Sequence, residues 1–110
     1  MPNAGVHNPN VIDLIGHHPE TDIVSLGMVE EREWDGSERR LLELEEKIQN
    51  YFSFIVDGQL ARMYPNYLGK PIEMKLFCVT LPDAKTNRFI ENVKTKLADY
   101  KIGFVVSQLK

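Results

Sequence analysis

Cysteine is nearly absent from this chain, because Cys78 is its one cysteine. A single thiol excludes an internal disulfide, and disulfide-free proteins are typical of reducing compartments. The chain also lacks any run of about 18 apolar residues, which excludes a helix that spans a membrane. The N-terminus, MPNAGVHNPN, lacks the basic and apolar regions of a signal peptide. These absences predict a cytoplasmic protein that does not enter a membrane.

Catalytic and nucleotide-binding motifs are absent as well. The sequence contains neither G-x-x-x-x-G-K-[ST] nor G-x-G-x-x-G, and no serine lies in a G-x-S-x-G context. His17 and His18 have carboxylates nearby, but adjacent histidines point apart, which favours a solvated loop over a metal site. Cys78 has no neighbouring histidine and is interpreted as a core residue. The sequence therefore predicts no catalytic residue, cofactor or metal, and it favours a non-enzyme.

Charge is moderate and unevenly placed. The net charge is -3, with 43% hydrophobic and 26% charged residues, an ordinary balance for one globular domain. Acidic side chains dominate residues 1–69 and basic ones dominate residues 70–110. The two parts either neutralise each other on folding or face each other across an oligomer interface. A pI near 5.6 and acids that interrupt the basic segment argue against nucleic-acid binding.

Hydrophobic periodicity divides the chain into strands and helices. Strands are predicted at 11–15, 23–30, 72–80 and 104–109, and the polar run GHHPETD predicts a hairpin loop after the first. A long helix is predicted to start at Asp35 or Ser37 and to continue to about residue 64, with Gly58 as a possible cap or kink within it. A second helix follows the sequence LPD. The predicted apolar stripe of the long helix contains Leu41, Leu44, Ile48, Tyr51, Phe52 and Ile55.

The order strand, strand, helix, strand, helix, strand predicts an α+β fold, a two-layer α/β sandwich. Its four-stranded sheet is mixed, because a hairpin joins antiparallel strands whereas the strand–helix–strand unit at 72–109 requires parallel ones. Each helix has one main apolar stripe, so both helices are expected on one face of the sheet. We expect a single domain over residues 11–110 and a flexible N-terminal arm over residues 1–10.

The face of the sheet without helices is the first candidate site. Its predicted apolar residues are Ile23, Val29, Phe77, Val79, Val105 and Leu109, and the run YFSFIVDG adds Phe54 beside the helical stripe. Monomers rarely leave so much apolar surface in water. We therefore predict a homodimer, or another protein partner, bound through Phe54, Phe77, Val79 and Val105. Two alternatives are that the N-terminal arm folds over this surface, or that the second half of the long helix is buried more deeply within one monomer.

Polar and aromatic residues around the long helix form the second candidate site. They are Trp34, Asp35, Asn50, Asp57, Arg62 and Tyr64. Trp and Tyr join an apolar body to a polar tip, which is typical of binding surfaces. The same residues also suit a helix cap, a solvated helix face and a helix end. Two functions stay open: a non-enzymatic module that self-associates, and a small-molecule-binding protein or enzyme with a pocket near Trp34, Asp57, Arg62 and Tyr64.

Three stretches of the chain carry a resemblance to a known family. They are NPNVIDLI, MVEEREWDGSERRLLELEEKIQNYFSFIVDGQL and YPNYLGKPIEMKL. Together they resemble a family of small, uncharacterised bacterial proteins classed as a domain of unknown function, over about residues 8–109. The resemblance implies a bacterial, single-domain protein. It brings no activity, cofactor or site residue, because that family has no catalytic motif to match.

Overall fold

The computed structural model describes residues 4–109 and contains one four-stranded sheet in the order β1-β2-β3-β4. The strands are β1 (Leu14–His18), β2 (Ile23–Glu30), β3 (Ile72–Cys78) and β4 (Ile102–Gln108). β1 pairs antiparallel with β2, whereas β2, β3 and β4 run parallel. The mixed sheet predicted from the sequence is confirmed.

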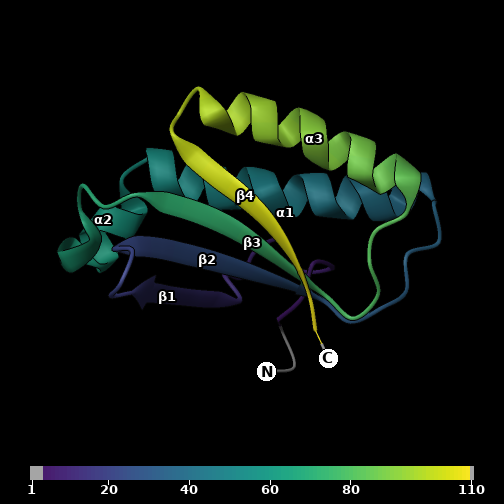
Figure 1. The fold of residues 1–110 in the computed structure, drawn as a ribbon, viewed down its shortest axis with the longest axis horizontal. Helices are drawn as coiled ribbons and strands as arrows, with labels where there is room; N and C mark the ends of the chain where they lie inside the picture. Colours follow the sequence, from purple (N-terminus) through teal and green to yellow (C-terminus); the bar gives the residue numbers. More distant parts are fainter. Residues whose placement is uncertain (1–3, 110) are drawn as a thin grey trace.

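Two long helices cover one face of this sheet. α1 (Glu38–Val56) connects β2 to β3, together with the short α2 (Gln59–Met63) and the 3-10 turn η1 (Pro65–Tyr67). α3 (Ala84–Ala98) connects β3 to β4 and lies beside α1 (Figure 1). The fold is therefore the predicted two-layer α+β arrangement, with the opposite face of the sheet free of helices.

Side-chain caps fix where the helices begin. Ser37 precedes α1 and its side chain accepts a hydrogen bond from the Arg40 amide. Ser37 was one of the two residues at which the sequence predicted the helix to start. Asp83 does the same for α3 through the Thr86 amide. α1 ends at Val56 with Asp57 as its C-cap, and Gly58 follows with a φ of 85°, a left-handed conformation that glycine adopts without strain. The predicted long helix is thus two helices, because the turn at Gly58 separates α1 from α2.

Strand β1 differs from its prediction. It was expected at residues 11–15, with the two histidines in a loop. In the structure His17 and His18 belong to β1 and pair with Val24 and Ile23 of β2. The chain reverses within the next four residues, where Asp22 has a φ of 65°. This shorter turn extends the hairpin and places Leu14 in the sheet.

The core lies between the sheet and the helices. The inward side chains of the two central strands are fully buried, as their alternation predicted: Val24, Leu26, Met28, Met74, Leu76 and Cys78. Leu44, Ile48 and Tyr51 of α1 pack against them. Val6 of the N-terminal segment is also part of this core, and its amide donates to the Val29 carbonyl.

Because Val6 is buried in the core, residues 4–10 lie against the domain. Residues 1–3, the start of the predicted N-terminal arm, lie outside the described residues, and the flexibility of the arm stays a prediction.

The apolar run YFSFIVDG is partly covered from within the molecule, since Tyr51 and Phe54 are buried whereas Val56 is 45% exposed. Phe54 is only 8% exposed and belongs to the core with Leu60 of α2. Ile12 and Ile15 pack on the same cluster from the N-terminal side. Phe54 is therefore unavailable as an interface residue, and for this side chain the alternative of deeper burial in one monomer is the correct one. The described residues contain no helix long and apolar enough to cross a membrane.

Candidate functional site

A fully buried ion pair joins the N-terminal segment to α1. The Lys47 ammonium lies 2.8 Å from Asp13 Oδ1, and both side chains are completely shielded from solvent. Lys47 Nζ also donates to the carbonyl oxygens of Asn8 and Val11, at 2.6 and 2.7 Å. The second Asp13 oxygen accepts from the Val29 amide. A buried charge pair is tolerated when further hydrogen bonds satisfy both groups, as they do here.

Tyr51 lies beside this pair. Its hydroxyl donates to the Gly27 carbonyl at 2.5 Å and accepts from the Asp13 amide at 2.9 Å. Burial raises the pKa of the Tyr51 hydroxyl well above its usual value, so the group stays protonated. A neutral hydroxyl with both roles occupied holds the backbone in place and is unsuited to proton transfer. We assign Tyr51, Lys47 and Asp13 a structural role.

A second ion cluster lies at the end of β2. Glu30 is buried and accepts from Arg32 and Arg40, at 2.7 and 3.0 Å. Hydrogen bonding to Glu30 raises the pKa of the Arg32 guanidinium above its usual value. Arg40 also lies over the Trp34 ring, 5.8 Å from its centroid. The contacts of Glu30 with Arg32 and Arg40 connect the start of α1 to the end of β2. They also pair the buried charges of Glu30 and Arg40.

The predicted polar cluster is divided between the two ends of α1. Trp34 and Asp35 precede the helix, whereas Asp57, Arg62 and Tyr64 follow it. A helix of 19 residues is about 28 Å long, so these groups cannot share one pocket. The Trp34 indole donates to the Thr80 carbonyl at 3.0 Å. The Asp35 carboxylate accepts from the Ser37 amide, and hydrogen bonding by Ser37 lowers its pKa.

Part of the cluster does meet at the second end of α1. Asn50, Asp57 and Tyr64 line a cavity of about 530 Å³. Asn50 donates from its amide to the Pro9 carbonyl at 2.5 Å. Arg62 lies outside this lining and donates to the Asp57 carbonyl at 3.3 Å. The structure therefore brings Asn50, Asp57 and Tyr64 together around one cavity, with Arg62 in contact with Asp57 outside the lining. It separates Trp34 and Asp35 from this group by the length of α1.

The uncovered side of the sheet carries a group of apolar side chains. We call it the outer sheet face, and its members are Leu14, Val29, Phe77, Val79, Val105 and Leu109. Leu14 is 52% exposed, Val79 44%, Leu109 39% and Val105 38%, whereas Val29 and Phe77 are half-buried. These residues come from all four strands and their ends. Three of the four predicted interface residues, Phe77, Val79 and Val105, lie on this face.

Gly27 leaves space for two apolar side chains of the outer sheet face, Leu14 and Phe77. A Cβ at this position would lie 3.0 Å from the Phe77 ring and 3.1 Å from Leu14 Cβ. The glycine thus lets side chains from β1 and β3 approach each other across β2. Sequence reasoning missed Leu14 because the register of β1 against β2 was not known. The pairing of Leu14 with Gly27 supplies that register.

The other end of this face is polar. Ser25 donates to a Glu73 oxygen at 2.7 Å, and these two residues are register partners in β2 and β3. Lys75 lies over the Phe77 ring at 5.6 Å, at the border between the polar and apolar areas. The face therefore has an apolar area beside one acidic and one basic residue.

The histidines of β1 make contacts that suit a structural role. His17 Nε2 lies 2.8 Å from Asp22, whose pKa is lowered by hydrogen bonds from Lys70 and His17. The His17 ring stacks on Tyr67 with 5.7 Å between centroids. Residues 4–109 contain no group of three or more His, Cys, Asp or Glu side chains that could hold a metal ion.

The chain was compared with protein families, curated proteins and solved structures. Neither the curated proteins nor the solved structures contain a match to this chain. The profile of a family of unknown function, DUF6572, matches residues 4–110. This match covers nearly the whole chain, including the sheet, α1 and α3. The chain therefore belongs to the family of unknown function DUF6572.

Proposed function

We propose that this protein is a non-enzymatic interaction module that forms a homodimer through the outer sheet face. The supporting observation is a group of exposed or half-buried apolar side chains on the face of the sheet that no helix covers. Isolated apolar residues are normal on a protein surface, but an area built from four strands is typical of an interface. Phe77, Val79 and Val105 remain in the proposed interface, and Leu14 and Leu109 join them.

The charges beside the apolar area support self-association in particular. In a two-fold dimer the same surface meets itself, so each residue contacts a partner and receives the reciprocal contact. Glu73 and Lys75 are two residues apart on β3 and have opposite charges. A two-fold axis near them brings Lys75 of one protomer toward Glu73 of the other. Such pairing sets the orientation of the two copies more than their affinity.

The size of the face predicts a weak dimer. Four strands of about seven residues cover roughly 20 Å by 23 Å, from the usual strand spacing and rise. This projected area is below the roughly 800 Å² per partner of a standard stable interface. We therefore expect a reversible dimer with a dissociation constant in the micromolar range.

Paired aspartate substitutions test this proposal. Val105→Asp places a charge on the outer sheet face at a site already 38% exposed, so folding should tolerate it. Leu42→Asp is the matched control, since Leu42 is 56% exposed on α1, in the other layer. We expect V105D to be monomeric by analytical ultracentrifugation and L42D to dimerise like the parent. Equal dimerisation of V105D and the parent, with both folded by circular dichroism, would reject the interface.

A small-molecule-binding function is the second candidate, and the cavity lined by Asn50, Asp57 and Tyr64 supports it. Several polar groups around one cavity can orient a polar ligand. A thermal-shift screen of polar metabolites against the parent and Asp57→Ala tests this function. A ligand that raises the melting temperature of the parent alone is expected. Equal shifts for both proteins, or none, would exclude a site that uses Asp57.

The cellular setting is part of the same proposal. The one cysteine, Cys78, is buried and unpaired, which supports a reducing compartment such as the cytoplasm. Bacterial origin, which the sequence resemblance implies, stays a prediction.

A further inference from the structure

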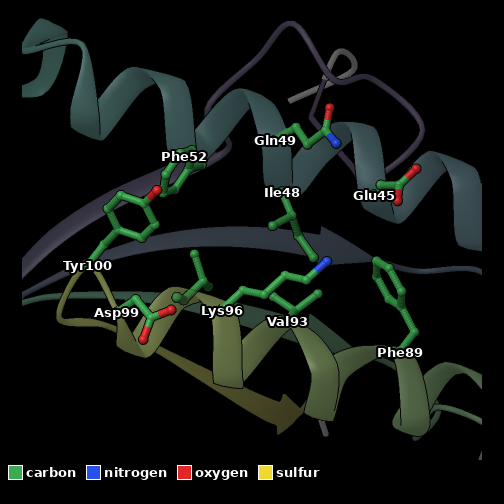
Figure 2. A pocket seen from close by; sticks show the side chains of 10 residues that line it. Glu45, Ile48, Gln49, Phe52, Phe89, Val93, Lys96, Asp99 and Tyr100 are labelled. Carbon is green, nitrogen blue, oxygen red and sulfur yellow. The ribbon is translucent and has the colours of Figure 1, made fainter.

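A groove runs between α1 and α3 and is separate from the surfaces described above. Its volume is about 410 Å³, within the range of roughly 300 to 1,000 Å³ that is typical of small-molecule sites. It is lined by Glu45, Ile48, Gln49 and Phe52 of α1 and by Phe89, Val93, Lys96, Leu97, Asp99 and Tyr100 of the α3 segment. Figure 2 shows the apolar members of this set facing the space between the two helices.

Aromatic side chains mark the two ends of the groove. Phe52 and Tyr100 meet edge to face at one end, with ring centroids 4.8 Å apart and planes at 81°. Phe89 lies toward the other end (Figure 2). Phe52 and Phe89 are only half-buried, and Tyr100 is exposed, so these rings keep contact with water. An apolar group placed between them would remove that surface from water, which favours binding.

Lys96 supplies the positive charge of the groove lining, whose other charged members, Glu45 and Asp99, are acidic. Its side chain extends along the groove toward Ile48 and Val93 (Figure 2). Lys94, on the same helix, pairs with Glu91 at 3.0 Å, whereas the Lys96 ammonium has no ion pair or hydrogen bond among residues 4–109. Glu45 and Gln49 turn their polar ends away from α3. An unpaired cation over an apolar surface is complementary to an anion that carries an apolar body.

The dimensions of the groove favour a small molecule over a protein segment. Along α1 the lining extends from Glu45 to Phe52, about 10 Å of helix. A partner helix is about 10 Å in diameter with its side chains and needs several turns of contact. The groove instead has about the length of an extended eight-carbon chain.

We propose that the groove between α1 and α3 binds a small amphipathic organic anion. Its apolar chain lies against Phe52 and Val93, and its carboxylate pairs with Lys96. This site is independent of the outer sheet face, since its lining belongs to the helical layer.

Three eight-carbon probes test the proposed chemistry. Octanoate, 1-octanol and octylammonium share one apolar chain and differ in the charge of the head group. Titrations of the full chain, followed by backbone amide NMR shifts, should show saturable changes around Ile48 and Val93. We expect octanoate to bind about three- to fivefold more tightly than 1-octanol, the usual size of one partly exposed ion pair. Tighter binding of octylammonium than of octanoate, or no saturable shift with octanoate, would overturn the proposal.

Two pairs of variants assign the binding to the groove. Lys96→Gln should reduce octanoate affinity to that of 1-octanol, whereas Lys94→Gln, outside the lining, should leave it unchanged. Val93→Trp should fill the groove and abolish binding, whereas Ala98→Trp adds the same ring at an exposed α3 position outside the lining. Unchanged octanoate affinity in folded K96Q would contradict the role of Lys96. V93W also changes the packing between the two helices. The octanoate affinity of K96Q therefore decides whether Lys96 binds the carboxylate.

Discussion

Lys47 is the residue through which the N-terminal segment is attached to α1. Three acceptors from that segment, two carbonyls and the Asp13 carboxylate, surround one buried ammonium. Removing one partner of a buried pair leaves the other charged and unsatisfied, which is more costly than removing both. The segment that carries Val6 and Ile12 therefore depends on a charge that looks, in the sequence, like an ordinary solvated lysine.

Lys47→Met should lower the free energy of unfolding by about 3–5 kcal/mol, the usual cost of breaking a buried pair. Lys94→Met removes an exposed pair with Glu91 and should change it by less than about 0.5 kcal/mol. Urea denaturation of both variants provides the measurement. Adding Asp13→Leu to Lys47→Met should recover part of the loss, because no lone charge then remains buried. A loss for K47M as small as for K94M would contradict this account.

Cys78 gives a prediction about reactivity. Burial raises the pKa of its thiol to about 11, so little reactive thiolate is present near pH 8. We expect the native protein to react with a disulfide reagent such as DTNB far more slowly than the protein in denaturant. Rapid reaction of the native protein, at the denatured rate, would show that the thiol is accessible and the core open.

Helix α3 depends on the cap at its first turn. The hydrogen bond from the Thr86 amide lowers the pKa of Asp83 below the ordinary 3.8. A lowered carboxyl pKa stabilises the fold above the unfolded-state pKa, and this stabilisation is lost as the pH falls through the folded-state value. Asp83→Ala should therefore cost about 1 kcal/mol at pH 7, and the difference from the parent should shrink below about pH 4.

Asp99→Ala is the matched control for this helix. Asp99 lies at the opposite end of α3, where a negative charge is unfavourable to the helix dipole. Its removal should leave stability unchanged or slightly raised. Thermal unfolding of both variants between pH 3 and pH 7 provides the comparison. A D83A deficit that does not depend on pH would contradict a role for the ionised cap.

The elements show which sequence patterns were informative. Alternation in β2 and β3 predicted the inward side chains, because one face of each strand is fully covered by helices. The stripe of α1 was displaced: its buried side includes Arg40, Lys47 and Phe54, whereas Phe52 and Ile55 are half-buried. The N-terminal segment covers the side of α1 that carries Lys47. The side that carries Phe52 stays partly open at the groove beside α3. When a segment distant in the sequence buries one face of a helix, the residues of the helix itself do not indicate it.

The candidate sites show the same limit of sequence-based prediction, because they depend on contacts between residues that are distant in the chain. Trp34 and Tyr64 appeared related because both flank α1, but the length of the helix separates them. Conversely, Leu14 and Phe77 are distant in the sequence and meet over Gly27. Strand register and helix length decide such contacts, and periodicity in one sequence does not contain register.

At the scale of the whole molecule, ion pairs connect the acidic residues 1–69 to the basic residues 70–110. Lys70 pairs with Asp22 at 2.6 Å, and Lys85 pairs with Glu38. These contacts favour the first of the two explanations of the uneven charge, neutralisation on folding. They leave the outer sheet face as the surface on which the proposed self-association depends.

The solution mass of the parent protein, by size exclusion with light scattering over a concentration series, tests this claim most directly. The account predicts a mass that rises reversibly from 12.7 kDa toward twice that value as the concentration increases through the micromolar range. A mass that stays at 12.7 kDa up to millimolar concentration would contradict self-association through the outer sheet face.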